Sequence, residues 1–200
     1  MSLGPVGCWL ETDPANPLHP FPADELGAAW PDIHLRTTPQ EFSELSLHRW
    51  NEFALKQAEP TQVVESFPFQ SSIRVLMQMN GSRETIDKYW SRWQSTVAAL
   101  NPVLIFLEEA NPRELITKAF ETRGPVWTDY FLQSVEQMPF ASTRQLEGME
   151  AAVGLLTHYN RLINELASAA PFPVLTCEAR PSDYAERQAR VNRYLNLENV

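Results

Sequence analysis

The sequence predicts an α/β fold in which a parallel, doubly wound sheet is flanked by helices. Short apolar runs end at polar residues, segments with helical spacing lie between them, and the run 103–107 is apolar at every position. Strands that alternate with helices are typical of a parallel sheet, and a continuously apolar strand is typical of one that is buried on both faces. We expect all 200 residues (1–200) to form one domain, because a chain of this length can enclose a full core.

The first predicted strand covers residues 6–10 and is followed by a long loop over 12–37 that is rich in proline. Loops of this length in compact domains are usually functional or disordered. Thr38 and Glu41 then have the spacing of a capping box. This pattern predicts a helix that ends near residue 58.

A short strand at residues 63–64 is followed by a predicted loop that is rich in phenylalanine, proline, glutamine and serine. Ser82 then caps a long helix. Its apolar and aromatic side chains recur at helical spacing: Ile86, Tyr89, Trp90, Trp93, Val97 and Leu100. This spacing favours core packing of the tryptophans over stacking on nucleic-acid bases.

The second half of the chain continues the alternation of strands and helices. After the apolar strand, Asn111 and Pro112 begin a helix that ends at Arg123 and Gly124. The remaining predicted elements are a short helix over 127–137, a long helix over 143–169, a strand over 172–177 and a helix over 182–195.

Composition narrows the classes of function. The net charge of −9 argues against a general nucleic-acid surface, although a few arginines would suffice to bind one nucleotide. No run of 18 apolar residues occurs, so neither a transmembrane helix nor a membrane partner is predicted. Cys8 and Cys177 form no metal or disulfide pattern, and we interpret them as free thiols of a cytoplasmic protein.

Four charged residues follow predicted strands or a strand-linked helix: Glu11, Glu65, Arg74 and Arg123. The carboxyl ends of parallel strands meet at one edge of a sheet, where ligands of open α/β sheets bind. Arginines at this edge could clamp a phosphate, and an acid could orient a hydroxyl or hold Mg²⁺. From the spacing alone, Glu65 and Arg74 could also be solvated loop residues or a surface ion pair.

Three short motifs resemble the nucleotide-kinase branch of the P-loop NTPases, which includes thymidylate kinases and deoxynucleoside kinases. They are Leu-Glu-Thr-Asp-Pro after the first strand, Val-Val-Glu-Ser after the second, and Asn-Pro-Val-Leu-Ile-Phe-Leu with the later Arg123-Gly124. The resemblance extends from about residue 7 to residue 197. It implies a protein that binds ATP and Mg²⁺ and transfers a phosphoryl group to a small nucleotide or nucleoside.

The resemblance also implies roles for the residues around the acceptor. Glu11 matches the acid near the phosphate acceptor, and Glu65 matches the acid of an Asp/Glu-Arg pair at a strand end. Either Glu11 or Glu65 would act as a base or hold the magnesium ion, and Glu65 is the expected metal ligand. Arg74 would clamp the acceptor. The other residues expected near the acceptor pocket are Trp9, Asp13 and Gln70.

The donor phosphates would be covered by a lid-like region over 124–144. By resemblance to this family, Arg123 would stand at the start of the lid and contact the transferred group. Arg144 is the one arginine within the region and would join Arg123 in binding the cofactor.

The chain departs from the family pattern at several points. Position 66 is serine where these kinases usually have arginine, and no G-x-x-x-x-G-K-[ST] phosphate loop occurs anywhere. In the family this loop follows a strand in the middle of the sheet. Its loss would leave two neighbouring strands without a partner between them. Either the native protein starts further upstream, or the remaining strands pair with each other, or a partner supplies the missing strand. The resemblance begins at what should be the second strand, which favours a truncated N-terminus.

Two functions remain open from the sequence. The first is a nucleotide- or nucleoside-kinase-like protein that transfers the γ-phosphoryl group of ATP in its complete form but has little or no activity as printed. The second is a non-catalytic relative that keeps the scaffold as a binding or assembly module. An incomplete sheet could also favour a homodimer.

Overall fold

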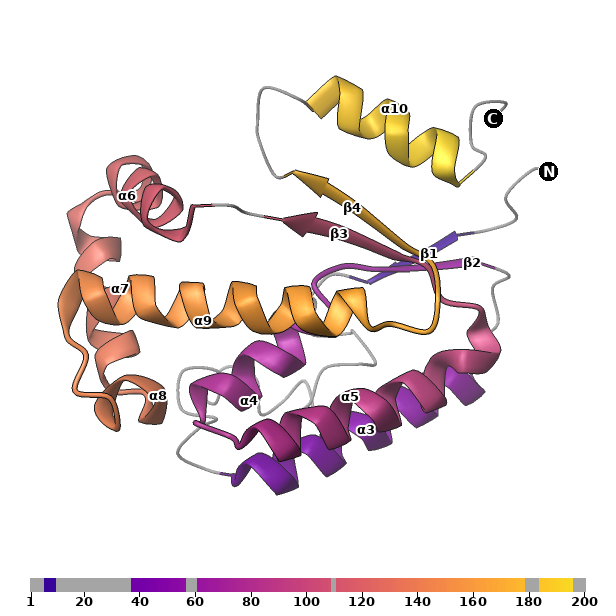
Figure 1. Cartoon of the computed structure of the whole chain (residues 1–200), viewed down its shortest axis with the longest axis horizontal. Coiled ribbons are helices and arrows are strands. Elements are labelled where there is room, and N and C mark those ends of the chain that lie inside the picture. The colour runs from indigo at the N-terminus through magenta and orange to yellow at the C-terminus, as the bar shows by residue number, and fades with distance from the viewer. Residues whose placement is uncertain (1–5, 10–36, 57–60, 109–110, 179–183, 196–200) are drawn as a thin grey trace.

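The computed structural model describes residues 6–9, 37–56, 61–108, 111–178 and 184–195 (Figure 1). It is a mixed α/β structure, which agrees with the predicted α/β class, and most of its described residues are helical. The described strands form two parallel pairs: β1 (Val6–Trp9) with β2 (Thr61–Val64), and β3 (Leu104–Glu108) with β4 (Val174–Glu178). No ladder joins the two pairs within the described residues, so those strands do not form one continuous sheet.

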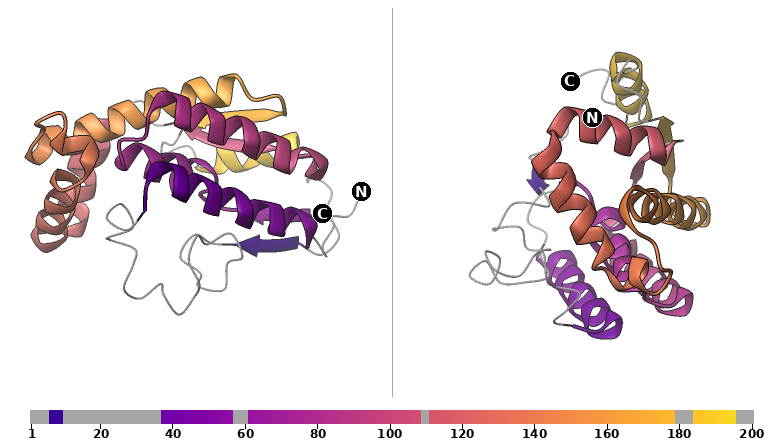
Figure 2. Two further views of the ribbon diagram at one scale, coloured as in Figure 1. Left: turned by 90° about the horizontal axis from the view of Figure 1, so that it is seen from below. Right: turned by 90° about the vertical axis from the view of Figure 1, so that its left-hand side faces the viewer.

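Two long helices follow the predicted caps. Helix α3 (Pro39–Leu55) begins with the capping box, in which the Thr38 side chain accepts from the Glu41 N–H and the Glu41 carboxylate accepts from the Thr38 N–H. Helix α5 (Arg83–Val97) begins at Ser82, whose hydroxyl accepts from the Thr85 N–H. The two helices lie side by side (Figure 2), and Arg92 of α5 forms an ion pair with Glu44 of α3.

The prediction of a loop between β2 and α5 is wrong, because most of this segment is helical. A π-helical turn, η1 (Phe69–Ile73), runs directly into α4 (Arg74–Gln78). Ser71 and Ser72 occupy buried positions on the inner side of this turn. Because serine is polar, these buried positions do not add to an apolar helical spacing, and the sequence gives no sign of the helix.

The second half of the chain is a series of helices around β3 and β4. A short 3₁₀ turn, η2 (Ala98–Leu100), precedes β3. The helices are α6 (Pro112–Arg123), α7 (Pro125–Glu136), α8 (Pro139–Ser142), α9 (Gly148–Ser168) and α10 (Tyr184–Tyr194).

The predicted helix over 143–169 begins too early. Helix α9 starts at Gly148 and cannot extend back to residue 143. Gln145 and Gly148 have positive φ values of 54° and 50°, whereas an α-helix requires negative φ values. The Glu136 carboxylate of α7 accepts from the Gly148 N–H and fixes the start of α9.

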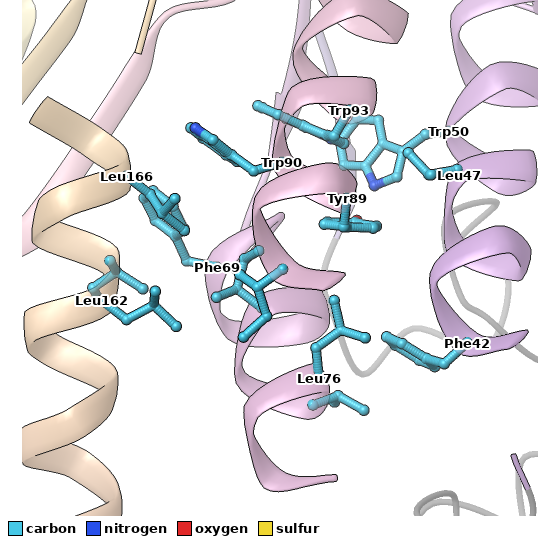
Figure 3. Close-up of a cluster of buried hydrophobic side chains, with 14 of the residues drawn as sticks. Phe42, Leu47, Trp50, Phe69, Leu76, Tyr89, Trp90, Trp93, Leu162 and Leu166 are labelled. Carbon is cyan, nitrogen blue, oxygen red and sulfur yellow. The ribbon is translucent and has the colours of Figure 1, made fainter. Parts of the chain in front are cut away.

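The main hydrophobic core is built around aromatic rings (Figure 3). The Trp90 and Trp93 rings stack with centroids 5.0 Å apart, and Trp50 meets Trp93 edge-on at 5.4 Å. Phe69 stacks on Trp90 at 5.3 Å. This confirms the interpretation of Trp90 and Trp93 as core residues, and Trp50 is buried with them. A second cluster contains Met77, Val135, Phe140, Ala141, Ala151 and Leu155.

A small hydroxyl network lies within the main core. The Ser46 hydroxyl is 3.0 Å from the Tyr89 hydroxyl and 3.2 Å from that of Ser72, so the network links α3, α5 and η1. Burial raises the pKa of Tyr89 to about 12, because the phenolate would lose its hydration, although the bonds to the two serines oppose the shift.

Replacing Tyr89 by phenylalanine is therefore expected to lower the free energy of unfolding by about 1 kcal/mol at neutral pH, the usual net value of one buried hydrogen bond. Because the folded pKa is raised above that of the unfolded chain, the Tyr89 contribution is complete below pH 10 and is lost as the pH rises toward 12. Urea unfolding at pH 7 and at pH 10–11 checks both points. A variant as sensitive to alkali as the parent would contradict this account.

Candidate functional site

The segment that follows β2 is the part of the predicted site that the structure describes best. Glu65 comes directly after the last residue of β2 and is exposed. Ser66 has a φ of 70°, and its carbonyl accepts from the Gln70 N–H at 2.9 Å and from the Ser71 N–H at 3.1 Å. These two bonds turn the chain from the strand into η1.

Arg74 stands at the first residue of α4 and is partly buried. Its Nε donates to the Gln70 carbonyl oxygen at 2.9 Å, while the Gln70 side chain is exposed. The structure therefore brings Gln70 and Arg74 together at the turn that begins with Glu65. We call Glu65, Gln70 and Arg74 the β2 corner.

Arg123 lies elsewhere, in the last turn of α6. Its guanidinium stacks over the Trp127 ring with the carbon 4.6 Å from the ring centroid. Trp127 in turn stacks on Phe131 of α7 at 5.0 Å. The contact holds Arg123 at the corner between α6 and α7, where a cation also interacts favourably with the C-terminal end of α6.

The contacts of Arg144 give this side chain a structural role. Its guanidinium donates to the Asn80 side-chain oxygen at 2.8 Å and to the Phe140 carbonyl at 3.0 Å, and stacks over the Phe140 ring at 4.1 Å. These contacts join α8 to the turn between α4 and α5. A role of Arg144 in binding donor phosphates remains a prediction.

Three predicted site residues are described only in part or not at all. Trp9 ends β1 and its backbone aligns with that of Val64 in the ladder, but its side chain is outside the described structure. Glu11 and Asp13 lie outside the described residues, as does nearly all of the loop over 12–37. The lid-like region over 124–144 consists of α7 and α8 and the residues around them.

Sequence reasoning missed two acids at strand ends. Glu108 is the last residue of β3 and Glu178 is the last residue of β4, and the two are aligned in the ladder. The rule that singled out Glu11 and Glu65 would have found them, since each ends an apolar run. Three described strands thus end at or next to a glutamate, an arrangement that attracts cations and repels phosphates.

The described residues do not by themselves fit ATP and Mg²⁺. Among them, no three His, Cys, Asp or Glu side chains come close enough to hold a metal ion. The strand ends carry carboxylates, and the backbone cradle that would hold phosphates is not encoded in the sequence. Glu65 as a magnesium ligand therefore remains a prediction.

A pocket of about 230 Å³ lies between the end of α9 and the strands β3 and β4. Its lining is neutral: Phe106, Asn164, Ala167, Ser168, Ala170, Phe172, Val174 and Thr176. None of the predicted site residues lines it. The pocket is therefore separate from the β2 corner.

Within the described part of the chain, no helix is both long enough and apolar enough to cross a membrane. The chain matches no family model, and comparisons with curated proteins and with solved structures give no significant match.

Proposed function

We propose that this chain is the scaffold of a nucleotide-kinase-like protein and that it binds a nucleotide or nucleoside acceptor at the β2 corner. The observation that carries the proposal is the path of the chain after β2: the exposed carboxylate of Glu65 directly follows the strand, and Arg74 begins α4 after the π-helical turn, where it is bonded to the Gln70 carbonyl. An acid at a strand end and an arginine on the next helix can together hold a hydroxyl and a phosphate.

The doubly wound sheet of the P-loop kinases is part of the same proposal. It is supported by the parallel direction of both strand pairs and by the break between them, since the family places the strand of its phosphate loop in the middle of the sheet. Phosphoryl transfer requires that loop. The chain as printed therefore binds the acceptor without turning over ATP.

Thermal unfolding in the presence of nucleosides and nucleoside monophosphates tests the proposal. A ligand at 100 times its Kd stabilises the folded state by about 2.7 kcal/mol, which raises the Tm of a protein of this size by about 5–10 °C. We expect one acceptor class to give such a shift, and we expect Arg74→Gln and Glu65→Gln to abolish it.

The matched controls lie on the remote helix α6. Arg113→Gln removes an arginine that is paired with Glu150 at 2.6 Å, and Glu121→Gln removes an exposed acid. Both should leave the Tm shift intact. If no nucleoside or nucleotide shifts the Tm of the parent chain, acceptor binding is refuted. The chain is also expected to be inactive as a kinase. This expectation is refuted if the parent chain turns over ATP and Glu65→Gln abolishes that turnover.

The second candidate is a non-catalytic binding or assembly module. The observation that favours it is the dispersal of the predicted arginines, because Arg123 stacks on Trp127 and Arg144 holds Asn80 and Phe140. A module of this kind would show no nucleotide-dependent shift and would associate with itself or with a partner as concentration rises.

A further inference from the structure

Three basic side chains gather around one aromatic ring where α8 and α9 meet. Helix α8 lies beside α4 (Figure 1). The Phe140 ring of α8 has the Arg144 guanidinium carbon over it at 4.1 Å, and the His158 ring of α9 lies against it with a centroid distance of 5.4 Å. On α9, Nη2 of Arg161 is 3.2 Å from Nδ1 of His158. We call Arg144, His158 and Arg161 the Phe140 cluster.

The cluster offers hydrogen-bond donors without acceptors. An arginine only donates, so Arg161 donates to Nδ1 of His158, and the neutral imidazole carries its proton on Nε2. Arg144 makes all of its described hydrogen bonds through Nη1. Within the described part of the chain, Nε and Nη2 of Arg144, Nε and Nη1 of Arg161, and Nε2 of His158 therefore have no acceptor. An oxyanion is the kind of ligand that accepts several such bonds at once.

The positive charge of the cluster is not balanced by carboxylates. Neither Arg144 nor Arg161 forms an ion pair with another described residue. Glu165 of α9 acts on His158 through its charge, but its carboxylate is bonded to Arg83 of α5. In a chain with a net charge of −9, the cluster is a local positive site that attracts anions.

His158 gives this site a response to pH. Burial holds the pKa of His158 below its ordinary value, and the charges of the three surrounding arginines, Arg161, Arg144 and Arg83, act in the same direction. Among the described groups that act on the ring, Glu165 opposes them. A bound anion would offset the arginine charges, so anion binding and protonation of His158 favour each other.

We propose that the Phe140 cluster binds a small oxyanion with two negative charges, a phosphate or sulfate group, through Arg144, His158 and Arg161. Each guanidinium can donate two parallel hydrogen bonds to such a group, and the imidazole can donate one more. The anion binds more tightly when the imidazole is protonated, because a third positive charge then faces it.

The site is distinct from the one proposed for the acceptor. Arg74 begins α4, whereas Arg144 is bonded to Asn80, which follows the end of α4. His158 and Arg161 belong to α9, outside the lid-like region over 124–144. The inference therefore does not require nucleotide binding at the β2 corner.

The test is a titration of the full chain with sodium sulfate at constant ionic strength, followed by NMR through the imidazole resonances. Sulfate keeps both charges between about pH 8 and about pH 5.5, the range in which histidine changes its charge. The bond from Arg83 lowers the pKa of Glu165, so this acid stays ionised there and His158 is the group of the site that titrates. We expect saturable shifts of the His158 resonances and binding about threefold to fivefold tighter at the lower pH, in the range of exposed charge pairs. His48, which lies 3.8 Å from Glu52 on α3, is the internal control and should not respond to sulfate.

Substitutions separate this site from other positive charges. Arg161→Gln is expected to weaken sulfate binding by about threefold to fivefold, and since Arg161 is exposed, the core stays intact. His158→Gln should bind sulfate with the same affinity at both pH values. Arg113→Gln removes an arginine paired with Glu150 and is the matched control, which should bind like the parent. Arg74→Gln should also leave sulfate binding unchanged, so a failure at the β2 corner and a failure here can be told apart.

The phosphate group could belong to a free anion or to a phosphate ester. Inorganic phosphate and glycerol 3-phosphate are compared at about pH 8, where both carry close to two charges. Tighter binding of the ester would support the site and assign it to an organic phosphate, and equal binding would support it as a site for the free anion.

Three results would overturn the proposal. The first is a titration in which sulfate leaves the His158 resonances unmoved, and the second is a parent chain whose affinity for sulfate is the same at both pH values. The third is equal affinity of the parent and the Arg161→Gln variant.

Discussion

Replacing Trp93 by alanine is expected to lower the free energy of unfolding by about 3–5 kcal/mol, the range for removal of a buried large aromatic side chain. Trp93 is only 5% exposed. Its ring contacts Trp50, Trp90 and Phe172, so the residue joins α3, α5 and the segment before β4. No neighbouring side chain can fill the space without giving up its own ring contacts.

The measurement is urea unfolding followed by far-ultraviolet circular dichroism, because the substitution itself changes tryptophan fluorescence. Trp127→Ala is the matched control. Trp127 is only partly buried, and its loss should cost about 1–2 kcal/mol. A loss below about 1 kcal/mol for Trp93→Ala would show that the helices do not pack around this ring.

Gly81→Ala is expected to destabilise the chain by about 1–3 kcal/mol, the usual cost of forcing extra atoms into a packed site. A Cβ at this position would lie 2.8 Å from the Leu76 carbonyl oxygen and 3.4 Å from the Cβ of Pro39. The same carbonyl accepts from the Gly81 N–H at 2.8 Å and closes the end of α4. A backbone oxygen in this bond cannot move aside cheaply.

Gly154→Ala is the control for the effect of adding a methyl group. Its Cβ would meet the end of the flexible Leu146 side chain at 3.1 Å, and it lies within α9. Alanine favours the helix over glycine by about 1 kcal/mol, so this change should be neutral or stabilising. Thermal unfolding compares the two variants, and equal Tm values would contradict the expected clash at Gly81.

The starts of helices α3 and α5 could be predicted because their signals are local. The capping box at Thr38 and Glu41 and the aromatic spacing after Ser82 depend only on nearby residues, and both helices begin where these signals place them. The turn at η1 could not be predicted in this way. Its buried Ser71 and Ser72 are polar, and Ser72 obtains a hydrogen-bonding partner from Ser46 in a helix far away in the sequence.

In the candidate site, too, local contacts could be predicted from the sequence and contacts between distant segments could not. Gln70 and Arg74 are four residues apart on a helical path, so their contact follows from sequence once the π-helical turn is known. The contacts of Arg144 with Asn80 depend on how α8 packs against the turn after α4. Strand pairing likewise depends on chain segments far apart in sequence, and spacing alone did not reveal that the described strands form two separate pairs.

Helix α9 has a consequence for cooperativity. Leu162 and Leu166 belong to the main core, Ala151 and Leu155 belong to the second cluster, and Tyr159 packs against both. A single helix therefore contributes side chains to both clusters, so a loss of packing in one cluster affects the packing of the other. The region of α7 and α8 is anchored to this helix through the second cluster, so it cannot swing away as an independent flap without unpacking one end of α9.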